Sequence, residues 1–131
     1  MQFRLDLKSG VPVYRQIIDQ VHGARAAGAV RPGDQLPTVR QLAVDLSINP
    51  NTVVRAYREL ELTGALATHQ GTGTFITDTK VEQTAGERDR KLDQLVAEFV
   101  SRAGREGFTV KELRSRLKDL VNQENGNAKR V

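Results

Sequence analysis

Apolar residues recur at helical spacing in two short stretches that a polar turn separates. The first face consists of Val39, Leu42, Ala43 and Leu46, and the second of Val53, Ala56, Tyr57 and Leu60. Each set follows the three- and four-residue steps of an amphipathic helix. Between them lies the sequence SINP at residues 47–50, which is rich in residues that end helices. Two short helices across such a turn predict a helix-turn-helix.

Capping residues mark where both helices begin. Thr38 is a good N-cap, and Gln41 stands three residues later, where a capping-box partner belongs. Asn49 is placed to cap the second helix, with Pro50 at its first position, where the missing N–H costs nothing. The second helix of such a unit can lie in the DNA major groove with its first turn at the base edges.

A β-hairpin is predicted directly after the second helix. Gly64 is placed as the glycine that follows a helix end, and residues 65–70 and 74–77 form two short extended segments. The tip between them contains Gly71 and Gly73, whose lack of side chains lets the backbone approach a sugar-phosphate chain closely. A hairpin in this position is the wing of a winged helix-turn-helix.

The residues before this unit predict a strand, a helix and a loop. Residues 3–7 alternate apolar and charged side chains, a pattern typical of a short half-buried strand. A helix is expected from Pro12 to about Gly28, and residues 30–37 are expected to form a loop. The apolar face of this helix packs in the core and consists of Val13, Ile17, Val21 and Ala24, with Tyr14 and Ile18 beside it.

The remaining residues predict a linker and two amphipathic helices. Residues 79–87 are polar and aperiodic, which indicates the linker. From Arg88 a broad apolar stripe returns until Gly104 or Gly107, and Thr109 with Glu112 then predicts a capping box for a second helix. Residues 123–131 are expected to fray in solvent.

Two helices of this size cannot bury both apolar stripes on each other, so they need a further surface. That surface is either the winged domain of the same chain or, as we favour, a second copy in an isologous dimer. The predicted dimerisation residues are Leu92, Leu95, Val96, Phe99, Val100, Leu113, Leu117 and Leu120. The predicted fold is mainly α with a small β-hairpin (α+β): a winged helix-turn-helix domain at 1–78, a linker at 79–87 and a two-helix dimerisation segment at 88–131.

The start of the second motif helix carries side chains suited to base contacts. Asparagine pairs with adenine, arginine with guanine, and a threonine methyl contacts the thymine methyl, which points to Asn51, Arg55 and Thr52. Asn49 alone is explained as well by capping as by DNA contact. The candidate DNA-binding residues are Thr38, Arg40, Asn49, Asn51, Thr52, Arg55, Gln70, Gly71, Thr72 and Gly73.

Residues from about 12 to 77 resemble the winged helix-turn-helix domain of the GntR family of bacterial transcription regulators. The matching segments are PVYRQI at 12–17, GDQLPTVRQLA at 33–43, NTVVRAY at 51–57, LELTG at 60–64 and GTGTFI at 71–76. The NPNTV turn, the Ala-Tyr pair and the short tail are similar to the YtrA-like branch of that family.

The resemblance implies that Arg40, the start of the recognition helix and the wing tip contact DNA. It also implies that the tail helices dimerise. Many members of the family carry an arginine where this chain has Pro50. The operator sequence that those members bind is therefore not assigned to this chain.

Composition narrows the choice of function only slightly. The 131 residues carry a net charge of +4, but residues 1–78 hold eight basic against seven acidic residues, so the DNA prediction depends on motif placement. There are no cysteines, and His22 and His69 lack ligand-like neighbours, so no metal or cofactor is expected. Without an apolar leader or a membrane-spanning run, we expect a cytoplasmic protein with no membrane partner.

These features predict a sequence-specific transcriptional regulator, in the simplest case a repressor, that binds a palindromic double-stranded DNA operator as a homodimer. A protein-interaction module would more often present an apolar patch where this chain has Arg40, Asn51 and Arg55. An enzyme is disfavoured because no nucleophile–base–acid group occurs, and RNA binding because aromatic residues are scarce. A small-molecule effector is left open, but one subunit is not expected to enclose a pocket for it.

Overall fold

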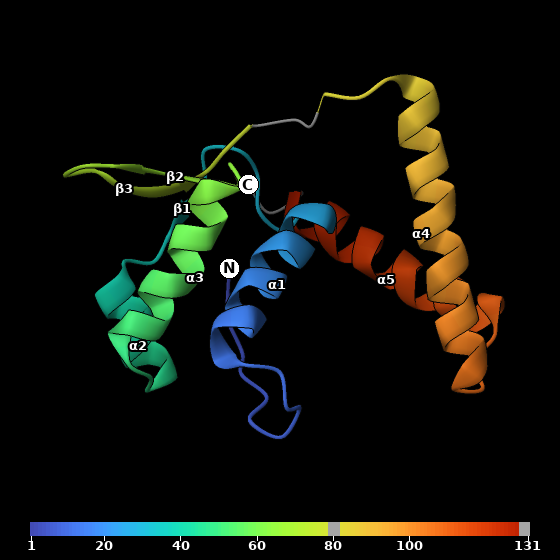
Figure 1. The fold of residues 1–131 in the computed structure, drawn as a ribbon, viewed down its shortest axis with the longest axis horizontal. Coiled ribbons are helices and arrows are strands. Elements are labelled where there is room, and N and C mark those ends of the chain that lie inside the picture. The colour runs from blue at the N-terminus through green and yellow to red at the C-terminus, as the bar shows by residue number, and fades with distance from the viewer. Residues whose placement is uncertain (79–81, 129–131) are drawn as a thin grey trace. The chain divides into compact units, whose positions relative to one another are not determined.

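The computed structural model describes residues 1–78 and 82–128, with the backbone alone described for residues 123–128 (Figure 1). The chain divides into two compact units, Met1–Thr79 and Lys80–Val131. The elements in chain order are α1 (Val13–Ala26), β1 (Gln35–Leu36), α2 (Val39–Leu46), α3 (Pro50–Leu62), β2 (Leu66–His69), β3 (Gly73–Ile76), α4 (Ala85–Arg105) and α5 (Val110–Ala128). The fold is therefore mainly helical with one small antiparallel sheet, as predicted.

Both caps of the helix-turn-helix form as predicted. The Thr38 hydroxyl accepts a hydrogen bond from the backbone N–H of Gln41 at 3.1 Å, and the Asn49 side chain accepts one from the N–H of Asn51 at 2.8 Å. Pro50 is the first residue of α3. Among the hydrogen bonds of the described residues, the return bond from the Gln41 side chain to Thr38 is absent, so the capping box is only half formed.

The turn between α2 and α3 is closed by backbone hydrogen bonds. Ser47 has a φ of 55°, and its N–H donates to the carbonyl of Val44 at 3.1 Å. The N–H of Ile48 donates to the carbonyl of Ala43 at 3.0 Å. These bonds satisfy the carbonyls of Ala43 and Val44 near the end of α2, and the chain reverses within a few residues, so α3 starts directly after the turn.

The predicted wing forms and gains a third strand. Strand β3 pairs antiparallel with both neighbours, which gives the order β1-β3-β2, with Leu66 opposite Ile76 and Leu36 opposite Thr74. Residues 30–37, predicted to be all loop, therefore contain β1. The strand is only two residues long, so no alternation in the sequence could indicate it. Burial of Leu36 and the free edge of β3 account for its formation.

The core of the first unit lies between the three helices and the sheet (Figure 1). All four residues of the predicted α3 face are buried, and the predicted faces of α1 and α2 are buried or half-buried. The buried cluster consists of Phe3, Ile17, Ile18, Val21, Val30, Leu36, Leu42, Ala43, Val53, Ala56, Tyr57, Leu60, Ala65, Leu66 and Ile76.

Residues 3–7 do not form the predicted strand. The side-chain amide of Gln16 accepts from the N–H of Asp6 at 2.8 Å and donates to the Asp6 carbonyl at 2.9 Å. Gln20 holds Arg4 in the same way, at 2.9 and 2.6 Å. The side-chain amides of these two α1 residues thus pair with the backbone groups of residues 4 and 6 that a neighbouring strand would otherwise have paired with.

Tyr57 ties α3 to the chain just before α2. Its hydroxyl donates to the Pro37 carbonyl at 2.8 Å, and burial raises the pKa of its phenol above the ordinary value.

We expect Tyr57→Phe to lower the free energy of unfolding by about 0.5–1.5 kcal/mol at neutral pH. Because the unfolded chain loses the phenolic proton near pH 10 while the folded chain keeps it, wild-type stability should also fall above about pH 10.

Urea unfolding at neutral pH and in the alkaline range measures both parts of this prediction. Tyr57→Phe lacks the titrating phenol, so its stability should decline less steeply at alkaline pH than that of the wild type. Parallel declines for the two proteins would contradict the assignment of the alkaline loss to Tyr57.

The second unit consists of two capped helices. Helix α4 starts at Ala85 and not at the predicted Arg88, because Thr84 and Glu87 form a reciprocal capping box. Helix α5 has the predicted box between Thr109 and Glu112. Its backbone is helical to Ala128. The fraying expected from residue 123 is therefore not seen in the described residues 123–128.

Within the described residues, no helix combines the length and apolar character needed to cross a membrane.

Candidate nucleic-acid interface

The first turn of α3 presents polar side chains to solvent, while the opposite face of the helix is buried in the core. Asn51 and Arg55 are exposed and Thr52 is half-buried, whereas Val53 and Ala56 on the opposite side are fully buried. The spacing of the buried residues fixes the rotation of the helix about its axis. The outward face therefore carries an amide and a guanidinium one helical turn apart.

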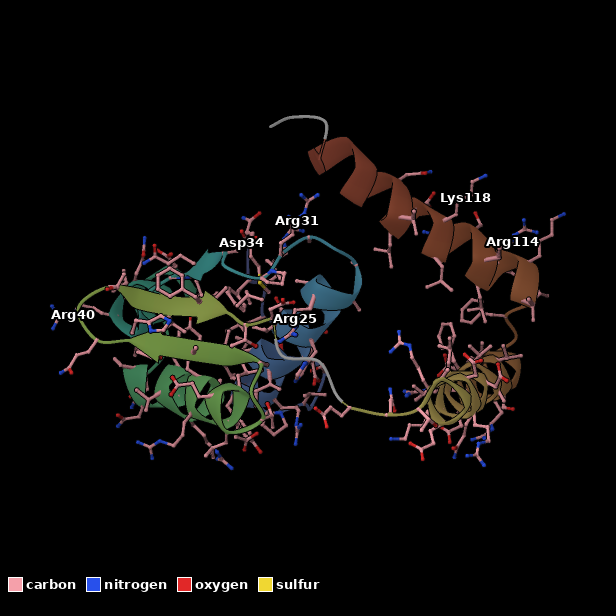
Figure 2. All side chains as sticks on the ribbon, turned by 90° about the horizontal axis from the view of Figure 1, so that it is seen from above. Arg25, Arg31, Asp34, Arg40, Arg114 and Lys118 are labelled. Atoms are coloured by element: carbon pink, nitrogen blue, oxygen red, sulfur yellow. The ribbon has the colours of Figure 1, made fainter. Side chains whose placement is uncertain are left out.

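Two of the predicted site residues have a structural task. The side chains of Thr38 and Asn49 are N-caps, each accepting a backbone N–H of its own helix. Both residues are also exposed, so capping and DNA contact are compatible at these positions. Arg40, in the first turn of α2, is exposed, and Figure 2 shows it at the margin of the unit.

The wing tip is a tight turn whose shape depends on glycine. The N–H of Thr72 donates to the His69 carbonyl at 2.9 Å, and Gly71 and Gly73 have φ values of +80° and +136°. Only glycine adopts such values without strain. The Gln35 amide of β1 donates to the Thr72 carbonyl at 3.2 Å and occupies the space that a Cβ at residue 73 would need. Gln70, Gly71 and Thr72 are exposed and Gly73 is half-buried.

Arg55 has a contact that the sequence did not indicate. The central carbon of its guanidinium lies 3.7 Å from the centroid of the Tyr14 ring, which belongs to α1. Tyr14 was assigned to core packing beside the apolar face of α1, and it is half-buried against the core. Its position on that flank is compatible with such a contact, but two residues so far apart in the chain leave no pattern in the local sequence that would indicate it.

No cluster of three metal-ligating side chains occurs among the described residues.

Comparison with known proteins identifies the family. The sequence profile described as "Bacterial regulatory proteins, gntR family" matches residues 13–76. The transcriptional repressor YtrA of Bacillus subtilis is 32% identical over 117 residues, which cover 89% of this chain and 90% of YtrA. This chain belongs to the GntR family. The winged helix-turn-helix described above is the DNA-binding domain of a GntR-family transcriptional regulator, a class of proteins without enzymatic activity.

Two further GntR relatives extend over nearly the whole chain. The uncharacterized transcriptional regulator YhcF of Bacillus subtilis is 35% identical over 87% of this chain and 93% of YhcF. A solved GntR-family transcriptional regulator from Listeria monocytogenes is 32% identical with a TM-score of 0.58, covering 86% of this chain and 98% of that chain. The similarity to the YtrA-like branch thus includes the short tail as well as the winged domain.

The tail of this GntR-family regulator exposes its apolar stripes. Among the described side chains of the second unit, only Ala103 is buried. Of the predicted dimerisation residues, Val100 and Leu113 are half-buried and the other six are exposed, with Phe99 at 47% and Leu95 at 63%. The six exposed residues are Leu92, Leu95, Val96, Phe99, Leu117 and Leu120.

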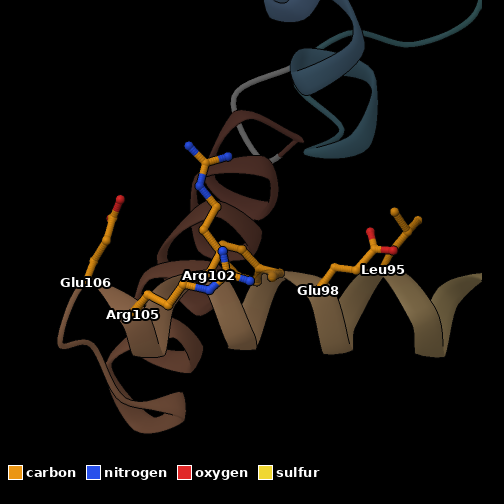
Figure 3. Close-up of a pocket in the computed structure, with 6 residues that line it drawn as sticks. Leu95, Glu98, Arg102, Arg105 and Glu106 are labelled. Carbon is orange, nitrogen blue, oxygen red and sulfur yellow. The ribbon is translucent and has the colours of Figure 1, made fainter.

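Two open depressions follow this apolar surface. One, of about 460 Å³, is lined mainly by apolar side chains of both tail helices, including Val96, Phe99 and Leu117. The other runs along the C-terminal half of α4, and its lining includes Leu95, Glu98, Arg102 and Arg105 (Figure 3). The tail therefore combines an apolar strip with charged margins, a composition typical of protein interfaces.

Proposed function

We propose that this protein is a transcriptional repressor that binds a palindromic DNA operator as a homodimer. Its recognition surface consists of Thr38, Arg40, Asn49, Asn51, Thr52, Arg55 and the wing tip at Gln70, Gly71, Thr72 and Gly73. The observation that carries the proposal is the exposed polar start of α3 on a helix held by buried residues. Similarity to the repressor YtrA supports repression as the outcome of binding.

The recognition surface divides into base contacts and backbone contacts. Asn51 and Arg55 carry the amide and the guanidinium that pair bidentately with adenine and guanine in the major groove. Arg40 and the glycine-rich tip suit phosphate and sugar contacts, which position the protein without specifying sequence. Because residues 1–78 are nearly neutral overall, attraction to DNA depends on where the exposed cations lie, and Arg40 and Arg55 place two of them on the recognition surface.

The exposed apolar stripes support dimerisation through the tail. Each side chain such as Phe99 that passes from water into an interface contributes about 1.5–3 kcal/mol if it becomes fully buried. An isologous dimer buries the same stripe of each subunit and presents two recognition helices, so half-sites one DNA turn apart, about 34 Å, form the matching operator.

Selection of bound duplexes from random DNA tests this function directly. The expected result is an inverted repeat whose half-site centres are separated by a whole number of helical turns. Recovery of one half-site without a symmetric partner would contradict the dimer, and recovery of no shared sequence would contradict sequence-specific regulation.

We expect Arg55→Ala to weaken binding to the selected duplex by about 1–3 kcal/mol and to relax preference at one base pair. The guanidinium fork pairs with one base, so its loss should not affect other positions. Binding titrations with the selected duplex and with duplexes changed at single positions measure both effects.

Arg55→Lys is the matched control because it keeps the charge and loses the planar fork. If Arg55 contacts a base, lysine should restore little of the lost preference. A uniform loss across all duplexes, with lysine restoring the affinity, would identify Arg55 as a phosphate contact instead.

A further inference from the structure

The contact between Tyr14 and Arg55 joins two helices that the core holds rigidly together. Helix α1 is anchored by the buried Ile17, Ile18 and Val21, and α3 by residues that include the buried Val53 and Leu60. Helices α1 and α3 pack against each other in the first unit (Figure 1). The backbone positions of the two partners are therefore fixed, and only side-chain rotation decides whether they meet.

The geometry of the pair leaves the hydrogen-bonding edge of Arg55 free. The central carbon of the guanidinium lies over the Tyr14 ring, 3.7 Å from its centroid, where the ring's quadrupole attracts a cation. All five guanidinium N–H donors point outward in the plane of the group. A contact through the ring face therefore uses none of them. Arg15 lies 6.0 Å from the same centroid, at the outer limit of such an interaction, so Arg55 is the principal partner.

An exposed arginine has a large cost of ordering when it binds. A long side chain loses rotamer freedom when it is fixed against a base, and this loss subtracts from affinity. A ring that already restricts the rotamers removes part of that cost before DNA arrives. Preorganisation of this kind strengthens binding without adding a contact to the DNA.

We propose that Tyr14 is a positioning residue for Arg55, which orients the guanidinium toward the base pair that it contacts. This inference rests on the proposed function, because Arg55 contacts a base pair only if α3 enters the major groove. Sequence preference at that base pair then depends on α1, a helix outside the helix-turn-helix. Tyr14 itself need not touch DNA.

A double-mutant cycle on the wild-type-selected duplex tests the proposal. Tyr14→Leu removes the ring, and it should weaken binding about 2- to 5-fold, the range that corresponds to an exposed cation–π contact. It should also reduce the preference at the base pair that Arg55→Ala relaxes. Tyr14→Phe keeps the ring face and should stay within about 2-fold of the wild type. In the Arg55→Ala background, Tyr14→Leu should have no further effect.

A measurement on the free protein tests the contact without DNA. In the wild type and in Tyr14→Phe, the ring current of residue 14 should shift the Arg55 side-chain protons upfield in the NMR spectrum. Tyr14→Leu should abolish that shift while leaving the spectrum of the buried core largely unchanged. Absence of the shift in the wild type would overturn the proposal.

The outcomes separate this proposal from the proposed function. If Tyr14→Leu weakens binding equally with and without Arg55, or equally for all duplexes, Tyr14 acts through the fold or the phosphate backbone and the proposal is wrong, while the regulator function stands. If the wild type selects no sequence from random DNA, the proposed function fails and this inference fails with it.

Discussion

Phe99→Glu is expected to convert the protein into a monomer and to weaken operator binding by about 10²–10⁴-fold. Phe99 lies on the exposed apolar stripe of α4, so in an isologous dimer both copies of the new carboxylate would be placed in the interface. The loss of affinity follows because two linked half-site contacts bind far more tightly than one. Light scattering measures the mass, and titration with the selected duplex measures the affinity.

Ser101→Glu is the matched control for this variant. It introduces the same charge on the same helix, two residues along, at an exposed position on the opposite face from the stripe. We expect it to remain dimeric and to bind the duplex as the wild type does. A dimeric Phe99→Glu protein with unchanged affinity would contradict dimerisation through the tail. A wild-type monomer would favour the alternative in which the tail packs on its own winged domain.

Leu60→Ala is expected to lower the free energy of unfolding of the winged domain by about 2–5 kcal/mol. Leu60 is 1% exposed in the middle of the core, so truncation removes buried apolar area and leaves a cavity. Both tyrosines of the chain, Tyr14 and Tyr57, lie in the first unit, and the chain has no tryptophan. Tyrosine fluorescence during urea unfolding therefore reports on this unit without interference from the tail helices.

Leu62→Ala makes the same chemical change two residues later on the same helix. Leu62 is 80% exposed, so we expect its truncation to change stability by no more than about 0.5 kcal/mol. Similar losses for the two variants would mean that the face of α3 assigned to the core is wrong. The outward orientation of Asn51 and Arg55 would then be wrong as well.

The helix-turn-helix and the wing could be predicted because their signals are local. Thr38 and Asn49 mark helix starts by their own capping chemistry, and the apolar steps of α3 define its buried face without reference to other elements. The same local logic, applied to Thr84 and Glu87, would have placed the start of α4 correctly. The polar composition of that segment led instead to a longer predicted linker.

Features that depend on partners distant in the sequence were missed. Strand β1 exists because β3 offers it an edge, and the segment near Arg4 is held by the Gln20 side chain of another element. The contact of Tyr14 with Arg55 belongs to the same class. No periodicity or composition within either partner's own segment indicates such pairs, which is why the predicted site lacked Tyr14.

The turn at the end of the wing limits which of its residues can be varied. Gly71 and Gly73 both have backbone angles that strain any other residue, and the Gln35 amide already fills the space beside Gly73. Thr72 stands between them without that restriction. Natural or engineered substitutions in this hairpin should therefore occur at Thr72 and at the neighbouring Gln70. The two glycines should keep the loop in the same conformation whichever side chains stand at those two positions.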